Sequence, residues 1–171
     1  MDINMMLAYK AWANSRTLAA ACALPAEELH RKRATTFDTI LRTLNHVWVV
    51  DDLFRCHLTG TEHPYTFRNT ETEPTIAELA DKQASMDQWY QRFAADLSSE
   101  DLDRVVEFTF VGGGDGRMTV AEILLHLVDH GTYHRGYVSD MMYQVPVEPP
   151  TTDLPVFLRD VWHARHTVKV T

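Results

Sequence analysis

Residues 119–144 read TVAEILLHLVDHGTYHRGYVSDMMYQ, and the fold class of the chain can be argued from this stretch. Thr119 and Glu122 have the T-x-x-E spacing of a capping box, which marks the start of a helix. Apolar side chains then recur three and four positions apart, at Val120, Ile123, Leu124, Leu127, Val138 and Met141. This spacing predicts one long amphipathic helix that ends before Val145 and Pro146.

Three further segments have the same helical spacing of apolar residues. The first starts after Asp2 as N-cap and stops at Pro25. The second is expected to begin near Thr35, because Asp38 three positions later approximates a capping box, and to end at Gly60. The third opens with a capping box at Thr75. The sequence therefore predicts four long helices.

The segments between these helices differ in character. Residues 25–36 are charged and read as a connection, whereas residues 61–74 form a polar loop that is too long for a simple turn. Residues 104–119 surround a GGGDG run with β-branched and aromatic residues, which indicates a small hairpin or loop insertion. A short C-terminal helix is expected in residues 153–166. Together these segments predict an all-α four-helix bundle with one crossover connection, formed as a single domain by residues 1–171.

The composition narrows the class of protein. The chain of 171 residues has the length of about one domain, and its 16 Lys and Arg against 24 Asp and Glu leave a net charge of −8, so no nucleic acid partner is expected. Two cysteines are too few for a disulfide framework or a cysteine zinc ribbon. Without a secretory leader or a long apolar run in the sequence, we expect a cytoplasmic protein with no membrane partner.

The nine histidines are the unusual feature of the composition. His130 and His134 are four positions apart on one helix, a spacing that places two imidazoles within reach of one metal ion. Each such step turns about 40° around the helix, so His126 cannot share their direction. The apolar stripe runs beside His134 and borders His130, which favours these two over His126 as ligands.

A third ligand has to come from another helix, and His46 is the best candidate. It lies in the middle of the apolar run LNHVWVVDDLF, where an imidazole without a partner would be costly to bury. His57, near the end of that helix, and His63, in the polar loop, are expected to be exposed. An ordinary core with incidental histidines is the alternative, since the H-x-x-x-H spacing also arises by accident in a chain with nine histidines.

Other residues near this group have two interpretations each. Asp51 falls on the apolar stripe of its helix. It is either a base or a group that supports the metal ligands, or it is the ion-pair partner of a neighbouring Arg. Tyr133 and Tyr137 either line a pocket or pack as an aromatic pair. Asp129 is expected in solvent, and Gly136 indicates the close approach of another helix. The hydrolase motifs HExxH and GxSxG and the GK[ST] ending of a phosphate-binding loop are absent from the sequence.

Three stretches together resemble a known family: LNHVWVVDDLF at 44–54, HLVDHGTYHRG at 126–136 and TDLPVFLRD at 152–160. They are similar to the DinB family of the DinB/YfiT-like metalloprotein superfamily, over almost the whole chain. The resemblance implies an up-down-down-up four-helix bundle. It also implies zinc or nickel held by His46, His130 and His134 with positions left open for water, and a homodimer. Many relatives have Gln where this chain has Tyr137, so the substrate does not transfer with the ligands.

Two classes of function follow from these expectations. The first is a metal-dependent enzyme, either a hydrolase or a thiol-dependent S-transferase, because related branches of the superfamily act with a low-molecular-weight thiol as cosubstrate. The second is a non-catalytic, stress-associated module that binds metal or another protein. The fourth ligand separates them, since a protein side chain closes a structural site whereas exchangeable water marks a catalytic one.

Overall fold

Four long helices dominate the computed structural model, which describes residues 2–145 and 147–166. They are α1 (Ile3–Cys22), α3 (Ile40–Thr59), α4 (Ile76–Ala95) and α6 (Val120–Tyr143). Short helices α2 (Ala26–His30) and α5 (Ser99–Asp103) lie in the connections. The predicted helical class is confirmed, together with a small two-stranded sheet.

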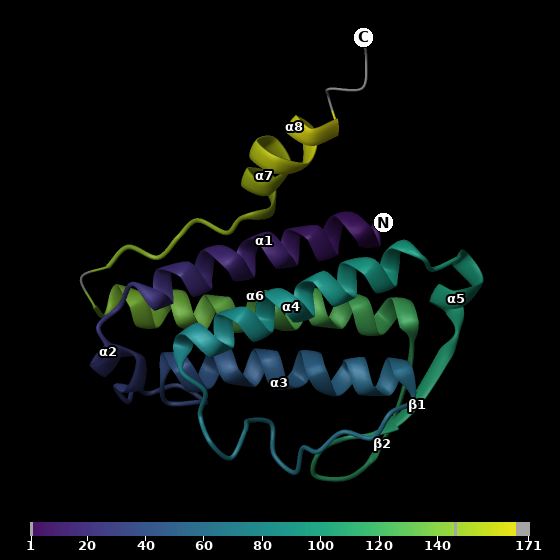
Figure 1. Ribbon diagram of the computed structural model, residues 1–171, viewed down its shortest axis with the longest axis horizontal. Helices are drawn as coiled ribbons and strands as arrows, with labels where there is room; N and C mark the ends of the chain where they lie inside the picture. The colour runs from purple at the N-terminus through teal and green to yellow at the C-terminus, as the bar shows by residue number, and fades with distance from the viewer. Residues whose placement is uncertain (1, 146, 167–171) are drawn as a thin grey trace.

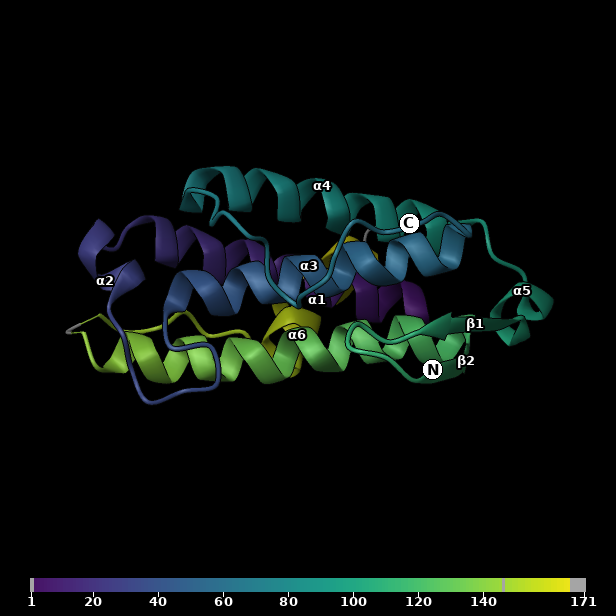
Figure 2. The same ribbon diagram turned by 90° about the horizontal axis from the view of Figure 1, so that it is seen from below.

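The long helices lie side by side, with α1 and α6 running in one direction and α3 and α4 in the other (Figure 1). Helix α1 packs against α4 and α6, and α3 packs against the same two helices. Because α3 and α4 are parallel, residues 60–75 must return along the length of α3. Seen from below, this loop runs across the outside of α3 (Figure 2).

Local chemistry explains where the helices begin. Asp2, Thr75 and Thr119 are the N-caps of α1, α4 and α6, as the sequence predicts, and the last two form complete capping boxes. The expected start of α3 near Thr35 is wrong, and the helix begins at Ile40. Asp38 has a φ of 61°, which no right-handed helix can continue. The hydroxyl of the next residue, Thr39, then accepts a hydrogen bond from the Arg42 backbone N–H.

Residues 25–36 are not a connection throughout, because they include α2. Pro25 precedes its first turn, and Glu27 and Glu28 lie near the positive, N-terminal end of the helix dipole, where negative charge is stabilising. Leu29 is buried. The apolar side chain of Leu29 gives this charged segment one anchor in the core.

The predicted hairpin is present, as strands β1 (Val105–Thr109) and β2 (Asp115–Thr119) pair antiparallel. Gly112, Gly113 and Gly114 all have positive φ, which suits glycine and closes the turn. The hairpin leads directly into α6.

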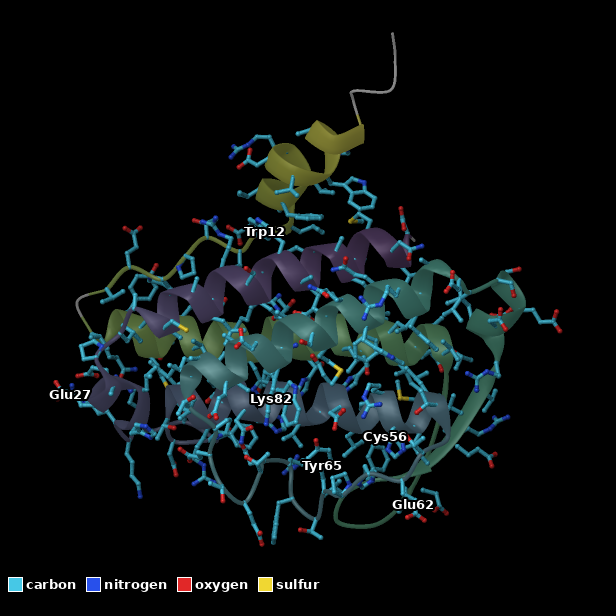
Figure 3. All side chains as sticks on the ribbon, in the orientation of Figure 1. Trp12, Glu27, Cys56, Glu62, Tyr65 and Lys82 are labelled. Carbon is cyan, nitrogen blue, oxygen red and sulfur yellow. The ribbon has the colours of Figure 1, made fainter. Side chains whose placement is uncertain are left out.

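The C-terminal segment packs on the outer side of α1. It consists of α7 (Leu154–Phe157), a π-helical turn η1 (Leu158–Trp162) and α8 (His163–His166). Trp12 lies on α1 below this segment (Figure 3), with its ring centroid 5.6 Å from that of the buried Phe157. No helix in the described ranges is both long enough and apolar enough to cross a membrane.

Candidate metal centre

Three histidines from two helices meet between α3 and α6. His46 comes from α3, and His130 and His134 come from successive turns of α6. One ring nitrogen from each lies within 4.8 Å of the others, so the group could hold a metal ion. The Nε2 atoms of His46 and His130 are 3.1 Å apart. Two nitrogens on one tetrahedral zinc ion lie about 3.4 Å apart if each bond is about 2.1 Å, so the spacing is close to that of a ligand pair.

The loops on either side orient the His46 ring. The Nδ1 atom of His46 lies 2.7 Å from the backbone carbonyl oxygen of Arg68, to which it donates when that nitrogen carries the proton. This hydrogen bond leaves Nε2 facing the other two histidines. The ring of Phe37 stacks on His46 at a centroid distance of 4.1 Å and lies 5.6 Å from His134. Residues 31–39 and 60–75 thus supply the walls of the site.

The environment keeps the imidazoles neutral. Burial is the main cause that lowers the pKa of His130 to about 2, and His134 and His46 lower it further because they would be like charges. Burial and the neighbouring His46 lower the pKa of His134 to about 4. The pKa of His46 is also lowered, chiefly by burial. Neutral imidazole is the form that binds a metal ion.

The donor set fits a divalent transition metal. The buried Nδ1 atoms of His130 and His134 have no hydrogen-bond partner among the described residues, so the protein's own groups leave these two nitrogens unsatisfied. Imidazole nitrogen suits zinc and nickel equally. No fourth His, Cys, Asp or Glu within residues 2–145 and 147–166 joins the group. A bound ion would therefore keep a position that these side chains do not fill.

Asp51 does not pair with an Arg, which was one of the two interpretations of this residue. It lies in a buried polar network with Lys10. The Nζ atom of Lys10, on α1, lies 2.6 Å from Oδ2 of Asp51 and 2.7 Å from Oδ1 of Asp87, on α4. Gln83 donates to both carboxylates. The hydrogen bonds of the Asp51 carboxylate thus go to Lys10 and Gln83, and none goes to a histidine of the group.

This network extends to the helix that carries two of the histidines. Asn14 donates to Asp87 and accepts a hydrogen bond of 2.9 Å from the Arg135 Nη1, so all four long helices are joined. Burial alone would lower the pKa of Lys10, but the charges of Asp51 and Asp87 outweigh it and raise the pKa. Burial raises the pKa of Asp51, and Lys10 opposes that shift. Lys10 also adds to the positive potential that lowers the pKa of His130.

The two tyrosines lie at the outer edge of the histidine group. Their hydroxyl oxygens are 2.8 Å apart, and their ring centroids lie 5.0 Å (Tyr133) and 6.1 Å (Tyr137) from that of His134. Tyr133 is 58% exposed, so it borders the site without closing it. The two tyrosines form the aromatic pair that was one of the alternatives, and their role in lining a pocket stays a prediction.

His57, His63 and His126 make ring contacts beyond the group of three, and the His126 ring also lies 5.4 Å from that of His130. His126 is half-buried, with its ring 5.1 Å from that of Phe54, and it does not belong to the metal-binding group. The expected exposure of His57 and His63 is wrong. Both are half-buried, because the His57 ring stacks on Phe108 and lies 5.4 Å from the His63 ring.

The glycine that permits close approach in α6 is Gly131, and the expectation for Gly136 is wrong. A Cβ atom on Gly136 would meet nothing within 4 Å. A Cβ atom on Gly131 would lie 3.0 Å from Nη1 of Arg135 and 3.8 Å from Cε of Lys10. The small residue is needed where the buried network passes α6. Asp129 is exposed, as expected.

Sequence reasoning missed four residues that shape the site: Phe37, Arg68, Lys10 and Asp87. A signal existed for the last two, because Lys10 follows the buried Leu7 by three positions and Asp87 precedes the buried Tyr90 by three. A charge on an apolar stripe indicates a buried partner. Phe37 and Arg68 lie in irregular loops, where no periodicity shows what a side chain contacts.

These features define a mostly helical protein with a group of three neutral histidines that could hold a divalent metal. A family model described as the DinB family matches residues 1–164. The chain therefore belongs to the DinB family.

Two known proteins are similar to the chain. The protein named Protein DinB of Bacillus subtilis (strain 168) is 28% identical over 156 residues, which are 88% of this chain and 90% of that protein. The crystal structure of a DinB-like protein from Bacillus cereus superposes with a TM-score of 0.66 at 19% identity, over 84% of this chain and 91% of the other. At that identity the second likeness establishes the fold alone.

Proposed function

We propose that this protein is a metal-dependent enzyme, a hydrolase or a thiol-dependent S-transferase, with a divalent metal held by His46, His130 and His134. A bound metal there supplies Lewis acidity, which lowers the pKa of a coordinated water or thiol. The observation that carries the proposal is the donor set: three neutral imidazoles meet without a fourth ligand among the described residues. Three protein ligands and one open position are typical of catalytic zinc.

The protein's own residues have distinct parts in this proposal. The Arg68 carbonyl directs Nε2 of His46 inward, and Phe37 shields the rings of His46 and His134 from water. Tyr133 and Tyr137 place hydroxyl groups at the edge of the site, where they can donate to a bound substrate. Asp51 would act as a positioning residue through Lys10, because its buried carboxylate holds Lys10, whose charge in turn lowers the pKa of His130.

The first test is metal content. Elemental mass spectrometry of untagged wild-type protein should find about one equivalent of zinc or nickel, which His46→Ala and His134→Ala should lose. His126→Ala is the matched control, because His126 lies one turn before His130 and outside the group. It should retain the metal. Circular dichroism on each variant checks that the helices persist. A wild type that takes up no metal after incubation with either ion contradicts the proposal.

A second measurement separates an enzyme from a non-catalytic metal-binding module. Cobalt-substituted protein should change its visible spectrum when 2-mercaptoethanol is added, because a thiolate can enter an open coordination position. An unchanged spectrum would mean a closed site and would favour the structural role. A positive result justifies screens for thiol transfer and for hydrolysis.

Three finer expectations belong to the same proposal. The four long helices would form a four-helix bundle with one crossover connection. The parallel directions of α3 and α4 support this, because the loop between them must return along the bundle (Figure 1). The cosubstrate in the transferase reaction would be a low-molecular-weight thiol. The protein would act as a homodimer, which sedimentation equilibrium tests against the 19.6 kDa mass of one chain.

A further inference from the structure

A hollow opens beside the histidine group, between the two loops that wall it. Its volume is about 400 Å³, enough for a small organic molecule. Phe37, Arg42, Phe67 and Arg68 line it, together with polar side chains of residues 69–71. Two of these residues also shape the metal centre, since Phe37 stacks on His46 and the Arg68 carbonyl binds the same ring. A molecule in the hollow would therefore touch two residues that contact the histidine group, although no histidine lines the hollow itself.

The lining of the hollow has two arginines against one glutamate, although the chain as a whole carries a charge of −8. Within the described chain, no carboxylate lies in ion-pair distance of the exposed Arg68, whose charge is one of the causes that lower the pKa of His46 and His134. Arg42 has a loose ion pair of 3.7 Å with Glu73, and Glu71 is the acidic residue in the lining.

A metal ion would add to this positive potential. All three proposed ligands are neutral, so the donor set would leave the charge of a divalent ion uncompensated. The nearby acids Asp51 and Asp87 do not compensate it, because the two positive charges of Lys10 and the neighbouring Arg135 balance them. An anion from solution is the ligand that such a site favours.

One wall of the hollow is aromatic. Phe67 is 70% exposed, although an aromatic ring of this size is usually buried. Phe37 lies between the hollow and the histidines, with its ring stacked on that of His46. The exposed ring of Phe67 and the half-buried ring of Phe37, beside the Arg68 guanidinium, suit a ligand with an apolar body and one charged group.

We propose that this hollow binds a small aromatic or apolar anion, with its carboxylate or phosphate group on the Arg68 guanidinium and its apolar body against Phe67 and Phe37. A guanidinium binds either group with charge-assisted, paired hydrogen bonds. Binding of the anion to Arg68 requires no metal. The inference rests on the proposed function only in treating the bound anion as the substrate of the metal-dependent reaction. It assigns Arg68 as a binding residue and names the class of substrate.

Isothermal titration calorimetry with benzoate and with phenyl phosphate tests the proposal on metal-free and zinc-loaded protein. At least one of the two anions should bind in both forms, and the tighter of them identifies the preferred group. Arg68→Gln should weaken that binding roughly tenfold or more. Zinc content should not change, since the backbone carbonyl of Arg68 and not its side chain contacts His46.

Three controls make the result specific. Arg92→Gln removes the same charge in the last turn of α4, outside the hollow, and should leave the affinity unchanged. Benzamide has the shape of benzoate without its charge and should bind at least tenfold more weakly. Acetate, which has the charge without the ring, should also bind more weakly than benzoate, and Phe67→Ala should reduce that difference.

The proposal is overturned if neither anion binds, if Arg68→Gln binds as tightly as wild type, or if benzamide equals benzoate. Equal affinities for acetate and benzoate would contradict the proposed contact of the ligand's apolar body with Phe67 and Phe37. A wild type that takes up no zinc would refute the proposed function, while titration of the metal-free protein would still decide the role of Arg68.

Discussion

A single backbone carbonyl sets the direction of the His46 ring. Because Nδ1 lies 2.7 Å from the Arg68 oxygen, Nε2 points at the two histidines of α6. A second partner that fixes ring orientation is usual for metal-binding histidines. The loop of residues 60–75 is thus part of the site through its backbone as well as through the Arg68 side chain.

At the level of single residues, Lys10 is the most sensitive position in the core. Lys10→Met would leave two carboxylates buried without their cation, and we expect the free energy of unfolding at pH 7 to fall by about 3–5 kcal/mol. Lys82→Met is the matched control, because Lys82 is exposed on α4 (Figure 3). Its Nζ atom lies 4.7 Å from the centroid of the Trp48 ring. The effect of Lys82→Met should stay within about 0.5 kcal/mol. Urea denaturation measures both.

The loss in Lys10→Met should also depend on pH. Burial raises the pKa of Asp51, and without Lys10 nothing of like strength opposes that shift. The folded state would then hold a proton that the unfolded chain releases above about pH 4. Stability of the variant should therefore rise as pH falls from 7 towards 5, so that the deficit relative to wild type shrinks. A deficit that is constant over this range would mean that the carboxylates stay ionised.

At the level of the helices, α6 carries two glycines with opposite roles. Gly136→Ala should stabilise the protein by about 0.5–1 kcal/mol, because alanine favours a helix and a Cβ atom there meets nothing within 4 Å. Gly131→Ala should lose part or all of this gain, since Arg135 must move from 3.0 Å and its hydrogen bond to Asn14 is disturbed. Equal stabilities of the two variants in urea denaturation would contradict the close packing at Gly131.

At the level of the whole molecule, a bound metal would link α3 to α6 across a large separation in sequence. His46 and His130 are 84 positions apart, so the ion would act on the folded chain and hardly on the unfolded one. Zinc at about 100 times its Kd should add about 2.7 kcal/mol to the free energy of unfolding. Calorimetry should find a higher Tm with zinc than with a chelator in wild type, and no difference in His46→Ala. An equal shift in both proteins would place the ion elsewhere.

Local patterns allowed much of the architecture to be predicted. Apolar spacing located the four long helices, and the N-caps Asp2, Thr75 and Thr119 located three of their starts. The β-branched and glycine pattern located the hairpin. These signals depend on residues within a few positions of each other, so they can be read before the chain folds. The start of α3 was missed because Thr35 and Asp38 also have a capping spacing, and only the left-handed backbone of Asp38 rules it out.

The histidine group could be predicted for a related reason. His130 and His134 share a helix face by spacing, and His46 is conspicuous as an imidazole in an apolar run. Their partners could not be predicted, because Lys10 meets Asp51 and Asp87 across 41 and 77 positions, and Phe37 and Arg68 reach the site from loops. Helical periodicity follows from the local chain, whereas the pairing of faces and the path of a loop depend on how the whole core packs. The choice of the three histidines that meet was thus present in the sequence, and the shape and charge of the hollow beside them arose only from packing.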